Sequence, residues 1–410
     1  MSFKGIILGI ENVLVSKDSA DWFPEIAKLL KFLQLRGIQA VVLANRDWSM
    51  QNDVGAPKEK IDDVFTRLAY KFPWFISSRD GSIPQKPNAA AVEFVLNKMG
   101  WQASETLFVG NDDADMMTAV NGHLLFLNAQ WYDASQIQGI KFSSPKDIAR
   151  FIDVFCLRSH LWHYELHGQE ANLYALGTYG TLEQKYRVIS DDAREAAKFG
   201  RGHPDFWMKY LFSTVYLSGL KFDYVATYPS SSQGNMPSVM RGAVADFAKC
   251  FRKTYMPDLI VRHTAARKSA FARSAGGDVD HLNQLNTIHL TKLPLRKPDL
   301  RYKAPPLDST KTVLVVDDFC TRGYSQEAAR LFIKQTGAKT IGLSLLKTIN
   351  RGYRELTTQA PPKFSPYEPV TFTSHNFTEH PYATSITDQT ESEIETKLLK
   401  YDNWDWPSGI

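Results

Sequence analysis

The residues of segment 313–325 have the types and spacing best suited to chemistry in this chain. Four apolar residues, Val313 to Val316, are typical of a buried parallel strand, and the carboxylates of Asp317 and Asp318 follow directly. A loop and a segment of helical composition at 326–334 come next. The loop contains Thr321, Arg322, Gly323, Tyr324 and Ser325. Backbone N–H groups at such a junction hold phosphate, and nearby carboxylates bind ribose hydroxyls or a hard cation. The segment therefore predicts a sugar-phosphate site, although the same residues also suit an ordinary turn into a capped helix.

This segment resembles the phosphoribosyl pyrophosphate (PRPP) loop of type I phosphoribosyltransferases, where an apolar strand, an acidic pair and a threonine-containing loop follow one another. The matching residues are Asp317, Asp318, Thr321, Gly323 and Ser325. Arg322 stands where a smaller or hydroxyl residue is commoner. Because the expected strand and helix flank the motif, we favour the phosphate-binding interpretation over the turn.

Two earlier segments extend the resemblance. An apolar run at 223–227 predicts a strand. The loop after it would hold the pyrophosphate half of PRPP through Ser230, Ser231 and Ser232, or else it is a serine-rich turn. A basic segment at 259–268 and the Lys-Phe-Gly-Arg element at 198–201 are similar to the competence-associated ComF-like branch of these enzymes. In that segment Arg262, Arg267 and Lys268 would neutralise the leaving group, or else they form a solvated basic face.

The resemblance implies a reaction at the anomeric carbon of PRPP, with pyrophosphate as the leaving group. Asp317 and Asp318 would be the catalytic carboxylates, holding the ribose directly or through Mg²⁺ and its water. Positioning and charge stabilisation would lower most of the barrier. The acceptor molecule has no recognisable pattern in the sequence.

The amino-terminal part of the chain alternates predicted strands with predicted helices. Strands are expected at 5–10, 38–43, 106–109 and 124–127, and helices at 24–35, 61–69 and 89–99. Such alternation is typical of a doubly wound parallel sheet, with ligands bound at the carboxyl ends of its strands.

Residues 3–153 resemble the haloacid dehalogenase-like (HAD) superfamily without a cap domain. Lys86 opens a helix as in the third motif of that family, and residues 108–116 resemble the fourth, with Asp112, Asp113 and Asp115. In the first motif, Gly9 stands at the position of the nucleophilic aspartate and Glu11 at that of the general acid. Ala44 replaces the hydroxyl residue of the second motif, and Asn45 follows it.

The glycine at position 9 decides whether this unit is expected to act as a phosphatase. An aspartyl-phosphate intermediate requires a carboxylate, so we expect phosphatase activity to be absent. A cluster of Glu11 and the three aspartates could still bind Mg²⁺ with Lys86 beside a phosphate, or the acidic run is a solvated loop. A structural or regulatory role is favoured for this unit.

Length and composition suit a two-domain protein. The 410 residues exceed one ordinary core, and we expect domains at 1–153 and 154–410, both α/β: a HAD-like Rossmannoid unit, then a type I phosphoribosyltransferase-like fold. The three cysteines show neither disulfide nor metal spacing. No apolar run is long enough for a membrane span and no signal peptide is recognisable, so a cytoplasmic location is expected. A net charge of +4 gives no indication of nucleic acid.

Two segments allow more than one interpretation. His160, His163 and His167 fall on one face of a helix expected at 153–167, where they could bind a metal but are better explained by packing. The tail at 350–410 contains a predicted helix at 391–401. It would cover the acceptor side of the site or dock a protein partner.

Three functions therefore remain open from the sequence. The first and favoured one is a phosphoribosyltransferase-like enzyme acting on PRPP or a related ribosyl phosphate with Mg²⁺. The second is a PRPP- or nucleotide-sensing module without turnover. The third is a scaffold component of a stress or defence assembly.

Overall fold

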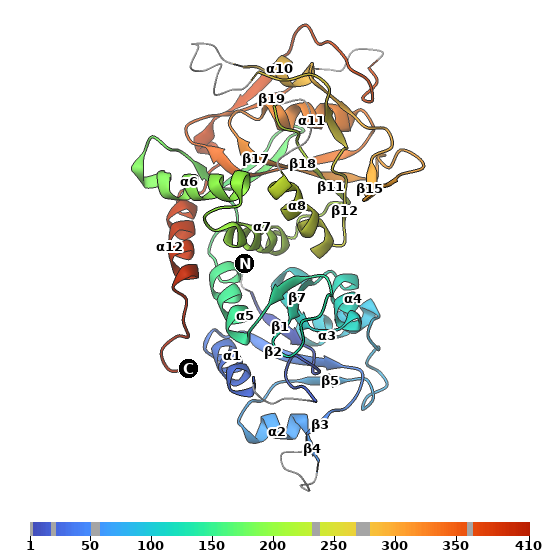
Figure 1. Ribbon diagram of the computed structural model, residues 1–410, viewed down its shortest axis with the longest axis vertical. Helices are drawn as coiled ribbons and strands as arrows, with labels where there is room; N and C mark the ends of the chain where they lie inside the picture. Colours follow the sequence, from blue (N-terminus) through green and yellow to red (C-terminus); the bar gives the residue numbers. More distant parts are fainter. Residues whose placement is uncertain (1–2, 18–21, 51–57, 232–237, 268–278, 359–363) are drawn as a thin grey trace.

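Two six-stranded β-sheets, each flanked by helices, form the framework of the protein (Figure 1). The computed structural model describes residues 3–17, 22–50, 58–231, 238–267, 279–358 and 364–410. All strand pairs in the first sheet are parallel, and in the second sheet only β9 runs antiparallel to its neighbour. The expected α/β class with two parallel sheets is confirmed.

The first sheet has the strand order β5-β2-β1-β6-β7-β8. Helices α1 and α5 pack on one face, and α3 and α4 cover the other with a separate apolar cluster. The elements of this part are β1 (Gly5–Leu8), α1 (Phe23–Leu35), β2 (Gln39–Ala44), β3 (Ser49–Met50), β4 (Glu59–Lys60), α2 (Ile61–Arg67), β5 (Trp74–Ile76), α3 (Ala89–Met99), a 3-10 turn (Ala103–Glu105), β6 (Thr106–Gly110), α4 (Asp113–Asn121), β7 (Leu125–Ala129), β8 (Ile140–Phe142), α5 (Pro145–Phe151) and a π-helix (Ile152–Cys156).

The second sheet has the order β12-β11-β17-β18-β10-β9. Helix α11 packs on one face, while α6, α7 and α8 cover the other (Figure 1). Its elements are β9 (Tyr164–His167), β10 (Asn172–Tyr179), α6 (Gln184–Phe199), α7 (Pro204–Ser218), β11 (Tyr224–Thr227), α8 (Ser238–Cys250), β12 (Thr254–Tyr255), β13 (Ile260–Arg262), α10 (Leu282–Leu285), β14 (Ile288–Leu290), β15 (Leu295–Lys297), β16 (Leu300–Arg301), β17 (Thr312–Cys320), α11 (Tyr324–Lys334), β18 (Lys339–Thr348), β19 (Tyr353–Leu356), β20 (Phe377–His380), a 3-10 turn (Tyr382–Thr384) and α12 (Thr390–Asp402).

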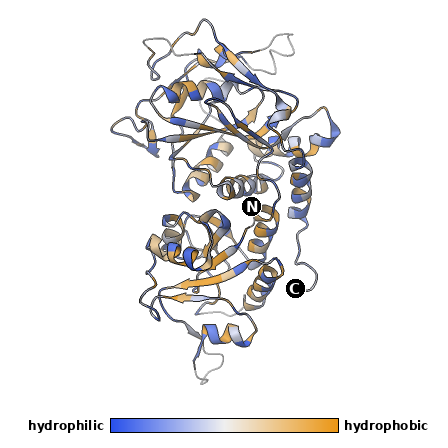
Figure 2. Ribbon diagram, turned by 180° about the vertical axis from the view of Figure 1, so that it is seen from behind, coloured by the Kyte–Doolittle hydropathy of each residue, from blue (hydrophilic) through white to orange (hydrophobic). Residues whose placement is uncertain are grey.

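Most expected elements are present with shifts of a few residues at their ends. Helix α3 has the predicted bounds, because Asn88 caps its first turn and Gly100 ends it in the left-handed region. The strands of the first sheet are buried along nearly their whole length, and Figure 2 shows them as largely hydrophobic. Burial on both faces is what a parallel sheet between helix layers requires.

The helix expected at 153–167 is wrong. The chain leaves the π-helix at Cys156 and returns as strand β9, which pairs with β10. The three histidines therefore have separate partners: His160 contacts Glu393, buried His163 contacts Tyr382 and Thr178, and His167 contacts Glu165. Packing and hydrogen bonding thus account for them.

The carboxyl-terminal segment joins the two units. Helix α12 starts beside the second sheet and runs down to the first unit, where the chain ends near α1 (Figure 1). There Asp153 accepts hydrogen bonds from the Trp404 indole and from Lys400, at 2.9 and 2.7 Å, and pairs with Arg36 at 3.0 Å. Trp404 and Trp406 both lie against the ring of Phe32. The tail is therefore a strap across both units. Within the second unit, β20 of this tail also lies next to the loop after β17, where Glu379 contacts Arg322.

Within the described residues, the model contains no helix that combines the length and the apolar character a membrane crossing would need.

The strap gives a direct stability prediction. Replacing Trp404 with alanine removes a buried ring packed on Phe32 and a hydrogen bond to Asp153, so it should lower the unfolding free energy by about 3–5 kcal/mol. Thermal unfolding followed by circular dichroism measures the change. The matched control is Leu399→Ala on α12, just before Trp404, where the side chain is 62% exposed and little change is expected. Equal melting temperatures for the two variants would show that the strap does not stabilise the fold.

Candidate functional site

The carboxyl edge of the second sheet collects the polar residues singled out from the sequence. Strand β17 lies between β11 and β18, and all three are parallel, so the loops that follow β11 and β17 are neighbours. Strand β17 continues to Cys320, which places Asp317 and Asp318 within the strand and not beyond its end. Their position is thus fixed by backbone pairing with β18.

The acidic pair is held close together and is only partly solvated. Asp317 is 8% exposed, and Asp318 lies 3.8 Å from the Lys198 ammonium group of α6. Burial, together with the neighbouring Asp318 carboxyl, raises the pKa of Asp317 well above its usual range, while Arg262 opposes the shift. Two adjacent carboxylates in a buried place disfavour double ionisation. A cation or a hydroxyl-bearing ligand would relieve that repulsion.

The conformation of the loop at 321–325 is fixed by buried side chains of α11 and β19. Gly323 stands at the N-cap of α11 with φ of +86°, and a side chain there would meet the ring of Tyr353 at 2.1 Å, so only glycine fits. The Tyr353 hydroxyl donates to Glu327 at 2.5 Å, and Glu327 is also bound by Arg330. This buried network fixes the start of α11, whose first-turn N–H groups face the loop.

Lys347 is a second brace, which the sequence analysis did not single out. It is fully buried on β18, donates to the Thr321 carbonyl at 2.6 Å and also contacts the Arg351 carbonyl. Burial lowers the pKa of Lys347 to about 8. The available signal was a single lysine directly after the mostly apolar segment 341–346.

A small cavity of about 70 Å³ lies on this loop. It is lined by Gln284, Asp317 and residues 319–326. A water molecule takes up about 30 Å³ of liquid, so the cavity has room for one phosphate group but not for a whole sugar phosphate. Arg322 and Tyr324 both belong to the lining, and they contact Glu379 and Arg354 respectively.

The serine loop after β11 is tied to the basic segment. The Ser230 carbonyl accepts from Arg262 at 2.5 Å, and the Ser231 carbonyl accepts from Ala266 at 2.9 Å. Arg262 is only 3% exposed and also donates to Thr287 and Gln284, so its guanidinium supports the loop from inside. Contact with a leaving group would require Arg262 to exchange these hydrogen bonds.

Of the other basic and serine residues predicted for the site, the described ones do not contact the acidic pair, except Lys198. Arg267 is exposed, and its backbone is bonded to the Asn283 side chain. Ser232 and Lys268 lie outside the described residues. Lys198 is the cation nearest to the acidic pair, and it also lies over the Phe319 ring.

The corresponding edge of the first sheet is closed by an ion pair. Lys86 donates to Asp115 at 2.5 Å, and both side chains are buried. Asn45 fixes the backbone of Lys86 through two hydrogen bonds. A side chain at Gly9 would place its Cβ 2.6 Å from an Asp115 oxygen, so Asp115 fills the space beside Gly9. Burial raises the pKa of Asp115, and the Lys86 charge opposes this shift.

The other acidic residues of this unit do not gather with Asp115. Glu11 is exposed and pairs with Lys17, while Asp112 accepts the backbone N–H of Asp115 as the cap of α4. Among the described residues, no three histidine, cysteine or acidic side chains are arranged to hold a metal ion. Of the two alternatives for this acidic run, the described residues favour the solvated loop: Glu11 pairs with Lys17 at the surface, and Asp115 is occupied by Lys86.

Comparison with known proteins identifies the first unit. The family model of haloacid dehalogenase-like hydrolases matches residues 7–123. None of the curated proteins compared with the chain matches it. A HAD-superfamily hydrolase of subfamily IA from Geobacter sulfurreducens is 16% identical, with 38% of this chain and 100% of that chain covered and a TM-score of 0.28.

Two further solved structures show weak similarity. A protein from Listeria monocytogenes serotype 4b is 15% identical over 37% of this chain and 97% of its own, with a TM-score of 0.29. The UMP synthase of Leishmania donovani is 12% identical over 83% of this chain and 71% of its own, with a TM-score of 0.17. Residues 7–123, with their motifs at Lys86 and 108–116, therefore form a haloacid dehalogenase-like hydrolase domain at the amino-terminal end of the chain.

Proposed function

We propose that the second domain has a type I phosphoribosyltransferase-like fold and acts on PRPP or a related ribosyl phosphate with Mg²⁺. The observation that carries the proposal is the junction of β17 and α11. It combines an acidic pair of which Asp317 is buried, a loop that requires glycine, a phosphate-sized cavity and the start of a helix. Neighbouring parallel strands add the serine loop at the same edge.

Each group has a definite task in this proposal. Backbone N–H groups at the start of α11, with Thr321 and Ser325, would hold the 5′-phosphate in the small cavity. Asp317 and Asp318 would bind the ribose hydroxyls or serve as carboxylate ligands of Mg²⁺. The cation would balance the charge of the leaving pyrophosphate. The serine loop would face that pyrophosphate, and Lys198 would add positive charge beside Asp318.

The reaction would be a substitution at the anomeric carbon. A bond forms from the acceptor nucleophile to this carbon as the bond to the pyrophosphate oxygen breaks, and pyrophosphate carries away the electron pair. Positive charge develops on the sugar ring, so fixed carboxylates close to the ribose stabilise the transition state.

A non-catalytic sensor of PRPP or nucleotides is the second candidate. It is favoured by the engagement of the two arginines nearest the site, since Arg262 is bonded inside the fold and Arg322 is paired with Glu379. Such a protein would bind the ribosyl phosphate but release no pyrophosphate. Phosphorus NMR of PRPP with Mg²⁺ and a panel of nucleobases separates the two, because only the enzyme forms free pyrophosphate.

Calorimetric titration with PRPP and Mg²⁺ tests the site itself. We expect binding by the natural protein and at least a hundredfold weaker binding by the double variant Asp317→Asn with Asp318→Asn. Because the free Asp317 has a raised pKa and a cation favours its charged form, binding should release protons. Titration in buffers of different ionisation enthalpy measures that release.

The control removes a carboxylate elsewhere in the same domain. Asp246→Asn changes an exposed residue of α8 that pairs with Lys249, and it should bind PRPP as the natural protein does. Circular dichroism should show that all the variants are folded. Equal affinity of the double variant and the natural protein would contradict the assignment of the site.

We propose in addition that the HAD-like domain does not hydrolyse phosphate esters. The natural protein, and also Gly9→Asp, should leave p-nitrophenyl phosphate intact in the presence of Mg²⁺. In the variant the new side chain meets the Asp115 carboxylate, so the melting temperature should fall as well. Gly81→Asp, whose Cβ would have no neighbour within 4 Å, should keep the natural melting temperature. Hydrolysis by the purified natural protein, at a rate that scales with its concentration, would refute the proposal.

A further inference from the structure

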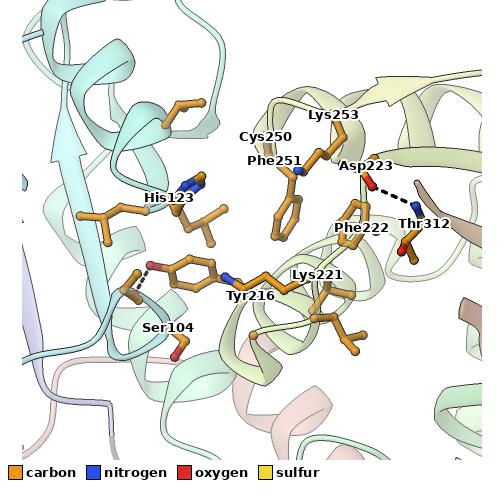
Figure 3. A pocket seen from close by; sticks show the side chains of 17 residues that line it. Ser104, His123, Tyr216, Lys221, Phe222, Asp223, Cys250, Phe251, Lys253 and Thr312 are labelled. Carbon is orange, nitrogen blue, oxygen red and sulfur yellow. Dashed lines mark hydrogen bonds between the residues drawn. The ribbon is translucent and has the colours of Figure 1, made fainter. Parts of the chain in front are cut away.

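A cavity of about 310 Å³ lies between the two domains, and neither candidate site contains it (Figure 3). Its wall from the first domain is formed around the segments that lead into β6 and β7, including Ser104 and His123. Its wall from the second domain includes Asp223 and Thr312, which lie at the amino ends of β11 and β17. Asp317 and Asp318 are near the other end of β17. Thr312 and Asp317 are five residues apart on an extended strand, a separation of about 16 Å, so the two sites are distinct.

The charged groups that face the cavity are mostly cations. Lys221 and Lys253 enter from the second domain, where Asp223 contributes one carboxylate; the uncharged imidazole ring of His123 enters from the first domain (Figure 3). That carboxylate already accepts the backbone N–H of Thr312 at 2.9 Å. Burial lowers the pKa of Lys253; Asp223 opposes this shift and Lys221 adds to it. Two lysines that repel each other favour a ligand group with more than one negative charge, such as a phosphate monoester.

Aromatic side chains supply the rest of the second wall. Phe222, Phe251 and Tyr216 line the cavity, and in Figure 3 the Phe251 ring stands across from His123. Phe251 is half-buried and packs on Phe222 with the two rings tilted by 49° and 5.9 Å between their centroids. A flat ring such as a nucleobase can stack against aromatic side chains of this kind. The ligand therefore needs both a planar ring and a doubly charged group.

The frame of the cavity is built from contacts between the domains. The Tyr216 hydroxyl is bonded to the carbonyls of Ala103 and Thr106, and Arg252 is bonded to Asn121. His123 and Arg252 both have positive φ, of 60° and 51°. Both residues lie where a helix ends, α4 and α8 respectively, in the left-handed conformation that is common at helix carboxyl ends. The turn at Arg252 presents Phe251 and Lys253 on either side of it.

We propose that this cavity binds a nucleoside 5′-monophosphate. Its base lies between Phe251 and His123, and its phosphate lies between Lys221 and Lys253. The volume is at the lower end of the range of small-molecule sites, which suits a ligand of this size and not a dinucleotide. Because both domains line the cavity, the bound nucleotide holds them in their present arrangement. The proposal does not depend on the activity of the site at Asp317.

Calorimetric titration of the full chain with adenosine 5′-monophosphate is the test. One molecule should bind per chain, with adenosine and inorganic phosphate each at least tenfold weaker, because each lacks one of the two groups recognised. The double variant Lys221→Gln with Lys253→Gln should bind the nucleotide at least tenfold more weakly. Lys221 is exposed, so Lys221→Gln alone keeps the fold and should still weaken binding severalfold.

Two controls locate the binding. Lys249→Gln removes an exposed charge from the same helix as Cys250 but outside the cavity, and its affinity should be natural. The variant Asp317→Asn with Asp318→Asn should also bind the nucleotide normally. No binding at millimolar nucleotide, equal affinity in the two-lysine variant, or loss of binding in the two-aspartate variant would each overturn the proposal.

Discussion

The pairing of β17 between β11 and β18 is the constraint on which the rest of the second domain depends. Parallel pairing aligns the three strands, so their carboxyl ends present the serine loop, the acidic pair and the glycine loop at one edge. The same alignment places Asp223 and Thr312 together at the opposite edge, against the first domain. One buried strand of nine residues thus separates the proposed ribosyl-phosphate site from the proposed nucleotide cavity.

The two domains treat their buried carboxylates in opposite ways. In the first domain the Lys86 ammonium neutralises Asp115 at 2.5 Å, and the pair fills the space beside Gly9, so little charge is left for a ligand. In the second domain the nearest cation to Asp318 lies at 3.8 Å, and Asp317 keeps a raised pKa through burial and its neighbour. A carboxyl with a raised pKa beside a cavity can accept a cation, whereas a carboxylate already paired with a lysine leaves little charge for a ligand.

Apolar and polar contacts join the two domains at their junction. An apolar cluster runs from α1 through the π-helix to α7, and the strap after α12 adds the polar contacts of Asp153. The HAD-like domain is therefore packed against the second domain by both apolar and polar contacts. A ligand in the cavity between them would act on the same junction, because Tyr216 and Arg252 bridge it.

The sequence by itself predicted the α/β class, the glycine at the position of the HAD-family nucleophile and the loop from Asp317 to Ser325, because these depend on local periodicity and on residue type. Even so, the helix expected around His163 was wrong, since pairing of β9 with β10 overrode the local pattern. Only the tertiary structure decided that Arg262 is buried as a brace, that Lys347 supports the loop and that Trp404 locks onto Asp153. In each case the two contacting residues are separated along the chain. Their contact distance and burial depend on how the elements pack together, and a local pattern of residues does not encode that packing.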